Sequence, residues 1–279
     1  MLFPIFYGLI APDIGLEKPH AALETATALA LRLNGQISIA IGALQITVPN
    51  LLSSATVEGL IANENKRRLD SANAFCEHVN DVSRRSGVTM HAAVIQGDVD
   101  QIKRQLAVRA RVNGLVFAEA GIPGELLGGA LIEPLLFESG RPVLVVPNGY
   151  TRGISFDHVL IGWDGSSSAA RAVWDSVPLL RLAKTIEIVT VTGEKDLSLV
   201  PAGNTLAPML SFLGKKPAVS ALALDGGTVA RRIKDHAAMT GAGLVVQGAY
   251  GRSRWREFVL GGVTREMLGD SPLPILMSH

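Results

Sequence analysis

The 279-residue chain has one cysteine, few aromatic residues and almost no net charge, and each scarcity excludes a class of protein. The single cysteine, Cys76, excludes an internal disulfide and a cysteine-based zinc site, and its helix-like surroundings predict a small packed side chain. A formal net charge of +1 gives no general attraction to nucleic acid or to an anionic membrane. Charged residues make up 18% and hydrophobic residues 48%, so we expect a large folded core.

The sequence also shows no pattern typical of a targeting peptide or of a membrane-spanning helix. No apolar run approaches the roughly 20 residues that a membrane-spanning helix needs. The first ten residues are apolar, but they carry no basic leader and no small-residue cleavage site, and Pro4 and the turn after Pro12 fit a first core strand. We therefore expect a cytoplasmic protein.

The chain is long enough for two domains of about 140 residues, and its pattern repeats. Buried-strand patterns fall at 3–10, 36–44, 88–95, 115–118 and 143–146, and again at 159–163, 185–191, 219–224, 243–247 and 273–277. Helical patterns fall between them, at 19–33, 53–86, 99–111 and 126–137, and again at 168–182, 205–213, 228–240 and from 264 onward. Strands that alternate with helices predict parallel sheets covered on both faces. We predict an α/β protein of two tandem doubly wound domains, residues 1–149 and 155–279, each with about five strands.

The most informative motif is a glycine-rich loop near the C-terminus. Gly248, Gly251, Gly261 and Gly262 stand between the strand at 243–247 and the helix near Thr264. Glycines let backbone N–H groups approach an anion closely, and a helix N-terminus adds positive potential. Two glycines alone would equally predict a tight turn, but the longer Gly-x2-Gly-x9-Gly spacing is more specific.

This spacing resembles the nucleotide loop of the universal stress protein family, in which Ser or Thr follows the third glycine. The segment 159–166, which ends a strand with Asp164, is similar to the family's first strand, and 273–277 is similar to its last. The resemblance implies Rossmann-like domains of the adenine nucleotide alpha hydrolase type that bind ATP or AMP, with Mg²⁺ beside the phosphates. One departure is Gly262, which stands where the family has a hydroxyl that reaches the phosphates. Thr264, two positions later, offers another hydroxyl.

The resemblance also assigns roles to individual residues. Asp164 would accept a hydrogen bond from the ribose or the adenine edge, although Asp-Gly-Ser-Ser is equally typical of a turn that caps a helix. Val191 would line the base. The phosphates would meet the backbone of Gly248, Gly251, Gly261, Gly262 and Val263, the Thr264 hydroxyl and the Arg252 guanidinium.

The first half departs from this loop. Ala118 and Gly121 stand in place of the first two glycines, the next interval has six residues instead of nine, and Glu119 adds a negative charge. Asp13 is the candidate for the first-strand acid. We expect the first domain to have lost the nucleotide site.

Catalytic motifs are absent from the sequence. It has no Gly-x-Ser-x-Gly elbow, no Gly-x4-Gly-Lys-(Ser/Thr) loop, and no metal-ligand spacing among its six histidines. The pattern favours a stress-response protein that binds an adenine nucleotide in a sensing or regulatory role, without substantial turnover. A nucleotide-independent scaffold or binding module remains the alternative, and both Gly262 and the first-half loop favour it.

The last strand of each half predicts how the halves associate. Pairing of Val143–Val146 with Leu273–Met277 would form a pseudo-dimer within one chain and hide two apolar strand edges. A homodimer of two chains remains open.

Overall fold

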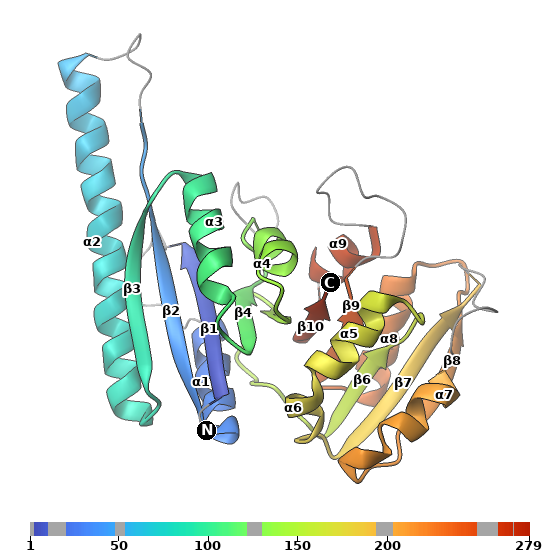
Figure 1. The fold of residues 1–279 in the computed structure, drawn as a ribbon. Helices are drawn as coiled ribbons and strands as arrows, with labels where there is room; N and C mark the ends of the chain where they lie inside the picture. Colours follow the sequence, from blue (N-terminus) through green and yellow to red (C-terminus); the bar gives the residue numbers. More distant parts are fainter. Residues whose placement is uncertain are drawn as a thin grey trace.

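The computed structural model describes residues 3–10, 21–47, 54–121, 130–193, 203–249, 262–269 and 271–279. Within these ranges ten strands form a single sheet, in the order β3-β2-β1-β4-β5-β10-β9-β6-β7-β8 (Figure 1). The strands are β1 (Phe3–Ile10), β2 (Gly35–Leu44), β3 (Met90–Gly97), β4 (Leu115–Glu119), β5 (Val143–Val146), β6 (His158–Gly162), β7 (Thr185–Thr192), β8 (Ala218–Ala223), β9 (Leu244–Gly248) and β10 (Ile275–Ser278).

Each half of the sheet has the same strand order. All pairs within β1–β5 and within β6–β10 are parallel. The halves join where β5 and β10 pair antiparallel, with Val145 opposite Ile275. The predicted α/β class with parallel doubly wound sheets is confirmed, and so is the predicted pairing of the last strands.

Helices cover both faces of this sheet. They are α1 (Ala21–Leu33), α2 (Ala55–Ser86), α3 (Val99–Ala110), α4 (Ile132–Glu138), α5 (Ser167–Asp175), α6 (Val177–Leu180), α7 (Gly203–Met209), α8 (Val229–Thr240) and α9 (Gly262–Gly269), with a 3-10 turn, η2, at Ser211–Leu213. Buried side chains of α1, α2, α5, α6 and α7 pack on one face, and those of α3, α4, α8 and α9 pack on the other. None of the described helices is both long and apolar enough to cross a membrane.

Local sequence explains where several helices begin and end. The Ser54 hydroxyl accepts from Val57 N at the start of α2, and Gly87 ends that helix in the left-handed conformation, at φ 73°. Asp98 caps α3 in a capping box with Gln101.

The single helix predicted at 168–182 is wrong in one respect, because it breaks at Ser176 into α5 and α6. Pro178 explains the break. Proline has no N–H to donate to the preceding turn, and it disfavours a helical conformation at the residue before it. The Ser176 hydroxyl instead donates to the Val173 carbonyl at 2.8 Å.

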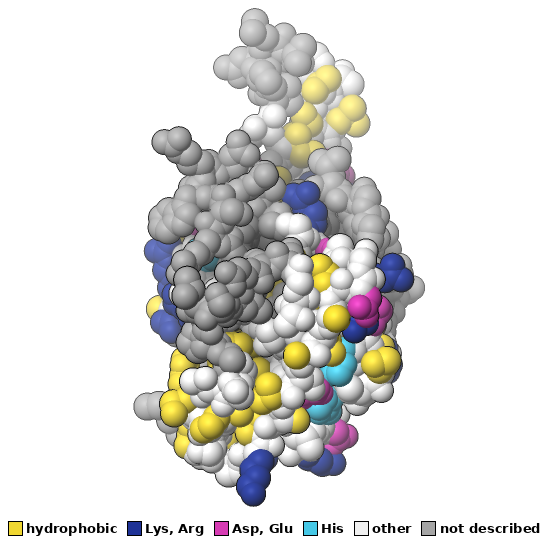
Figure 2. All heavy atoms as spheres, turned by 90° about the vertical axis from the view of Figure 1, so that its right-hand side faces the viewer, with side chains coloured by type: hydrophobic (Ala, Val, Ile, Leu, Met, Phe, Trp, Pro, Cys, Tyr) yellow, Lys and Arg dark blue, Asp and Glu magenta, His cyan; other side chains and the backbone are white. Residues whose placement is uncertain are grey.

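The two edges of the sheet differ. The first edge, β3, packs against the 32-residue helix α2, whereas β8 packs against the seven-residue α7. Alternate side chains of β8 are exposed, and Val219 is 44% exposed. Figure 2 faces this edge and shows hydrophobic side chains gathered on its lower left, over the side that carries α7. An uncharged edge strand of this kind invites pairing with other strands.

Candidate functional site

The candidate site lies beyond the carboxyl ends of β6, β7 and β9, where ligands of parallel α/β sheets bind. Gly162 pairs with Val189 on one side and with Gln247 on the other. Two residues farther along these three strands, the chain reaches Asp164, Val191 and Ala249. The sheet register therefore brings the predicted Asp164 and Val191 together, next to the start of the glycine loop.

Asp164 also has the local role that its sequence predicts. Its Oδ1 accepts a hydrogen bond from the Ser166 N–H at 3.0 Å, and the Ser166 hydroxyl in turn accepts from Ala169 N at 3.1 Å. Ser166, rather than Asp164, is therefore the cap of α5. The turn fixes the carboxylate at the N-terminus of α5, where the partial positive charge of the helix favours an anion.

Gly248 is a glycine because the N-terminus of α5 lies directly against it. A Cβ at this position would lie 2.5 Å from Ala169 N and 2.7 Å from both Ser168 C and Ser168 Oγ. Two of these atoms are backbone atoms, which cannot move aside independently of the helix. Gly248 therefore allows α5 and β9 to pack closely, and this packing brings the N-terminus of α5 to the rim of the sheet.

The start of α9 supplies three of the predicted residues. Gly262 is exposed, and a Cβ added there would meet no atom within 4 Å. Val263 is half-buried, and Thr264 is 3% exposed. Because the Thr264 side chain is packed into the core rather than displayed on the rim, its contact with a phosphate remains a prediction. The other predicted loop residues, Gly251, Arg252 and Gly261, lie outside the described residues.

A buried hydroxyl lies near this rim, on the residue before Val191. Thr190 precedes Val191 on β7, and its Oγ1 is buried without a hydrogen-bond partner. A Cβ at Gly203, at the start of α7, would lie 3.7 Å from that oxygen. A buried hydroxyl without a partner is costly, so this oxygen is available to a ligand or a water molecule.

The strand register of the first half corrects one predicted correspondence between the two halves. Gly114 N donates to Pro4 O just as Gly243 N donates to His158 O, which aligns β1 and β4 with β6 and β9. Counting along these strands places Glu119 at the position of Gly248 and Ile10 at the position of Asp164. The predicted counterpart of Gly248, Ala118, is therefore wrong by one residue, and the predicted first-strand acid, Asp13, lies outside the described residues. The difference of one residue arises because the glycines of the two loops are spaced differently from the strands that precede them, and only the strand hydrogen bonds fix the correspondence.

These substitutions change the chemistry of the first-half rim. An apolar side chain stands in place of the Asp164 carboxylate, and a carboxylate stands in place of Gly248. Burial raises the pKa of Glu119, although a hydrogen bond from the Gly149 backbone partly offsets it. Burial and the nearby Glu119 charge also raise the pKa of Tyr7. A rim with this partly buried carboxylate disfavours phosphate.

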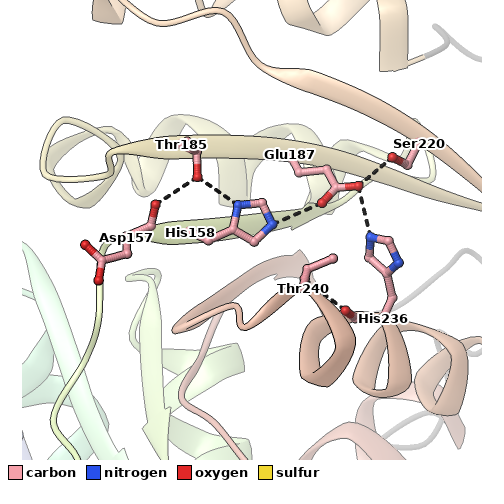
Figure 3. Close-up of polar contacts among 7 residues, drawn as sticks. All are labelled: Asp157, His158, Thr185, Glu187, Ser220, His236 and Thr240. Atoms are coloured by element: carbon pink, nitrogen blue, oxygen red, sulfur yellow. Dashed lines mark hydrogen bonds and ion pairs between the residues drawn. The ribbon is translucent and has the colours of Figure 1, made fainter.

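A second polar cluster, which the sequence did not single out, lies at the opposite ends of the second-half strands (Figure 3). Glu187 on β7 contacts His158, His236 and Ser220. Burial raises the pKa of Glu187, but hydrogen bonds from Ser220, His236 and His158 outweigh burial and hold that pKa below its ordinary value of 4.5. The available signal is Glu187 itself, the one charged residue in the strand segment Thr185–Thr192. Across the described ranges, no group of three or more His, Cys, Asp and Glu residues is arranged to hold a metal ion.

Comparison with known proteins relates this arrangement to one family. Residues 155–279 match the model of the universal stress protein family. The chain is similar over 98% of its length to 97% of a universal stress protein from Archaeoglobus fulgidus DSM 4304, with a TM-score of 0.69 and 16% identity. It is also similar over 99% of its length to 93% of a protein from Pseudomonas aeruginosa UCBPP-PA14 that is described provisionally as a universal stress protein, with a TM-score of 0.60 and 14% identity. No curated protein gave a match. At these identities the solved structures show the shared fold alone.

Proposed function

We propose that residues 155–279, which match the model of the universal stress protein family, bind an adenine nucleotide, ATP or AMP, in a stress-response role. The observation that carries the proposal is the meeting of Asp164, Val191 and Gly248 at the carboxyl ends of three adjacent parallel strands. Binding at this position agrees with the general behaviour of doubly wound sheets. The residues come from three separate segments of the sequence, so the fold, not the local motif, assembles the site.

The nucleoside end is assigned to the rim of β6 and β7. The Asp164 carboxylate, held by the Ser166 N–H, is oriented to accept a hydrogen bond from a ribose hydroxyl or the adenine edge. Val191 offers a half-buried apolar surface to the base. The Thr190 hydroxyl, buried without a partner, would gain a hydrogen bond from a polar atom of the ligand.

The phosphates are assigned to the glycine loop and to two helix N-termini. Close packing at Gly248 places the start of α5 at the rim, and α9 begins on the other side of the loop, at Gly262. Both helices direct backbone N–H groups and positive potential outward at these ends. Arg252 and a Mg²⁺ ion would neutralise the phosphate charge, and Mg²⁺ characteristically binds through phosphate oxygens and water.

The first half is proposed not to bind nucleotide. Ile10 and Glu119 occupy the places of Asp164 and Gly248, so the described part of that rim offers neither the acceptor for the ribose nor a neutral backbone for the phosphates. Its proposed role is structural. It forms the other half of an intramolecular pseudo-dimer, in which β5 pairs with β10 and covers the edge of that strand. We therefore expect one nucleotide per chain and a binding or sensing role without substantial turnover, in the cytoplasm.

A nucleotide-independent scaffold is the second candidate, and Gly262 favours it. The absent hydroxyl would weaken binding by about 1–3 kcal/mol, which is roughly one to two decades of affinity. Because a Cβ at position 262 meets no atom within 4 Å, a serine fits there. Restoring the family's hydroxyl should therefore strengthen binding if the nucleotide proposal is right.

Calorimetric titration of Mg-ATP into purified protein tests the proposal. Asp164→Asn should weaken binding by about tenfold or more, because it removes a charged acceptor, and Gly262→Ser should strengthen it. Asp157→Asn is the matched control. Asp157 precedes β6 and Asp164 follows it, so the two carboxylates lie at opposite ends of the same strand. If neither the wild type nor Gly262→Ser binds Mg-ATP, nucleotide binding is contradicted and the nucleotide-independent scaffold is supported. Equal losses in the Asp164 and Asp157 variants would contradict the assigned site.

A further inference from the structure

The strand β8 forms the edge of the second half, and its single neighbour in the described sheet is β7 (Figure 1). Leu224 N, just after β8, donates to Thr192 O on β7 at 3.0 Å. Backbone groups alternate in direction along a strand, so those of Val219, Ala221 and Ala223 point away from β7. These outward groups meet no other strand among the described residues, which leaves a row of donors and acceptors for a further strand.

The side chains of β8 leave room for such a strand. Its sequence, Ala-Val-Ser-Ala-Leu-Ala, has neither a charged residue nor a proline, which are the residues that commonly protect an edge. Val219 faces α7, because a Cβ at Gly203 would lie 3.1 Å from Val219 Cγ1. Figure 2 shows hydrophobic side chains gathered on that side of the edge. The opposite edge strand, β3, instead displays His91 and Gln96 to solvent.

The centre of the sheet shows how this chain satisfies uncharged strand edges elsewhere. The strands β5 and β10 carry no charged residue, and they pair antiparallel with Leu144 opposite Leu276. The two halves that meet there have the same topology and are related by an approximate twofold axis. A second copy of the chain would bring the same kind of partner to β8, namely the uncharged edge of a parallel half-sheet.

We propose that β8 pairs antiparallel with β8 of a second copy of the chain, so that two ten-stranded sheets become continuous. In the register that uses every outward residue, Ala221 lies opposite the partner's Ala221, and Val219 lies opposite the partner's Ala223. Ser220 then lies opposite the partner's Leu222. This register brings together neither two like charges nor two large side chains, so the strand is complementary to itself.

Charges at the two ends of β8 favour the antiparallel direction. Lys215 and Lys216 precede the strand, and Asp225 follows it. The Asp225 side chain is 73% exposed and lies 3.9 Å from Arg232, so its carboxylate still faces solvent. An antiparallel pair places the lysines of each copy near the partner's Asp225, whereas a parallel pair would place lysine beside lysine. The end charges therefore favour the arrangement that a twofold-symmetric dimer requires.

Sedimentation equilibrium of the full chain without nucleotide tests the pairing. The wild type should show a monomer–dimer equilibrium. Ala221→Pro removes an outward N–H and leaves the hydrogen bonds to β7 in place, a change that edge strands tolerate. The dissociation constant of the dimer should rise by about tenfold or more, because two symmetric hydrogen bonds at the twofold axis are lost.

The matched control is the same substitution at the other edge of the sheet. On β3, Gly97 O accepts from Gln45 N of the neighbouring chain segment, and Thr89 O accepts from Ile37 N of β2, so the N–H of Ala92 points away from β2. Ala92→Pro should therefore leave the dissociation constant unchanged. Thermal unfolding shows whether both proline variants are folded.

Cysteine cross-linking tests the register independently of any proline. Residues in a hydrogen-bonded antiparallel pair have Cα atoms about 5.5 Å apart, which is within the range of a disulfide. Diamide should therefore oxidise Ala221→Cys to a covalent dimer. The two copies of position 218 would lie six residues apart along the paired strands, about 20 Å at about 3.4 Å per residue, so Ala218→Cys should give no more dimer than the wild type, which carries Cys76.

Three results would each overturn the proposal. The first is a wild-type chain that stays monomeric at every concentration measured. The second is a dimer of a folded Ala221→Pro variant that is as strong as that of the wild type, which would place the interface elsewhere. The third is equal cross-linking of Ala221→Cys and Ala218→Cys. None of these results depends on whether the chain binds nucleotide.

Discussion

Leu144 lies directly opposite Leu276 where the two halves meet, with Val143 opposite Met277 and Val145 opposite Ile275. The pairing is symmetric about these two leucines, so an approximate twofold axis of the chain passes between them. Both leucines are fully buried, and they come from positions 132 residues apart. The centre of the ten-stranded sheet is therefore a contact between two halves that have the same topology.

The symmetry predicts similar effects for the same change on both sides of the axis. Leu144→Ala and Leu276→Ala should each lower the free energy of unfolding by about 2–5 kcal/mol, the usual range for a truncated buried leucine. Urea denaturation measures both values. A double variant whose loss departs from the sum of the single losses would demonstrate direct coupling across the seam. A cost under about 0.5 kcal/mol for either single variant would contradict the described pairing.

Substitution by alanine should lower the stability of the protein at one glycine of the candidate loop and not at another. Gly248→Ala places a Cβ 2.5 Å from Ala169 N, so it should lower stability by about 1–3 kcal/mol or more. Gly262→Ala meets no atom within 4 Å and should cause no loss, since alanine is the better helix former. Thermal unfolding of the two variants gives the comparison. If Gly248→Ala were as stable as the wild type, α5 could not lie as close to β9 as described.

Glu187 should make stability depend on pH on the acid side. Its pKa is lowered in the folded protein relative to 4.5, so its contribution is present above pH 4.5 and is lost as pH falls through the folded pKa. Urea denaturation between pH 3 and pH 6 should show the wild type losing stability more steeply than Glu187→Gln. Parallel curves for the two proteins would show that the carboxylate carries no such linkage.

The exposed strand β8 should respond to a charge on its edge. Val219→Lys replaces a 44% exposed valine, so it should reduce self-association without lowering the melting temperature appreciably. Light scattering at increasing protein concentration measures the effect, with Val112→Lys as the control. Val112 is 83% exposed but lies in a turn after α3, away from any strand edge. Equal effects from both lysines would mean that charge alone, rather than the strand edge, controls association.

The sequence predicted most elements because their signals are local. The apolar run at 143–146 and the helical pattern at 99–111 are read from neighbouring residues, and they match β5 and α3. The sequence pattern does not predict the break at Pro178, because apolar residues with helical spacing continue on both sides of it.

The candidate site could be predicted only in part. Asp164 and Gly248 were recognisable because each stands in a motif next to a strand. The Glu187 cluster was not, because its partners are 29, 33 and 49 residues away and become neighbours only through strand order and helix packing. For the same reason, the equivalence of Glu119 with Gly248 emerged only from hydrogen-bond register.

The number of adenine nucleotides bound per chain tests the central claim most directly. Protein purified without added ligand, then loaded with Mg-ATP and desalted, can be denatured and its supernatant quantified by chromatography and mass spectrometry. The account predicts about one nucleotide per chain in the wild type and none in Gly251→Glu, with Glu119→Gly unchanged from the wild type. A value of zero in the wild type would contradict nucleotide binding, and a value of two would contradict the loss of the first-half site.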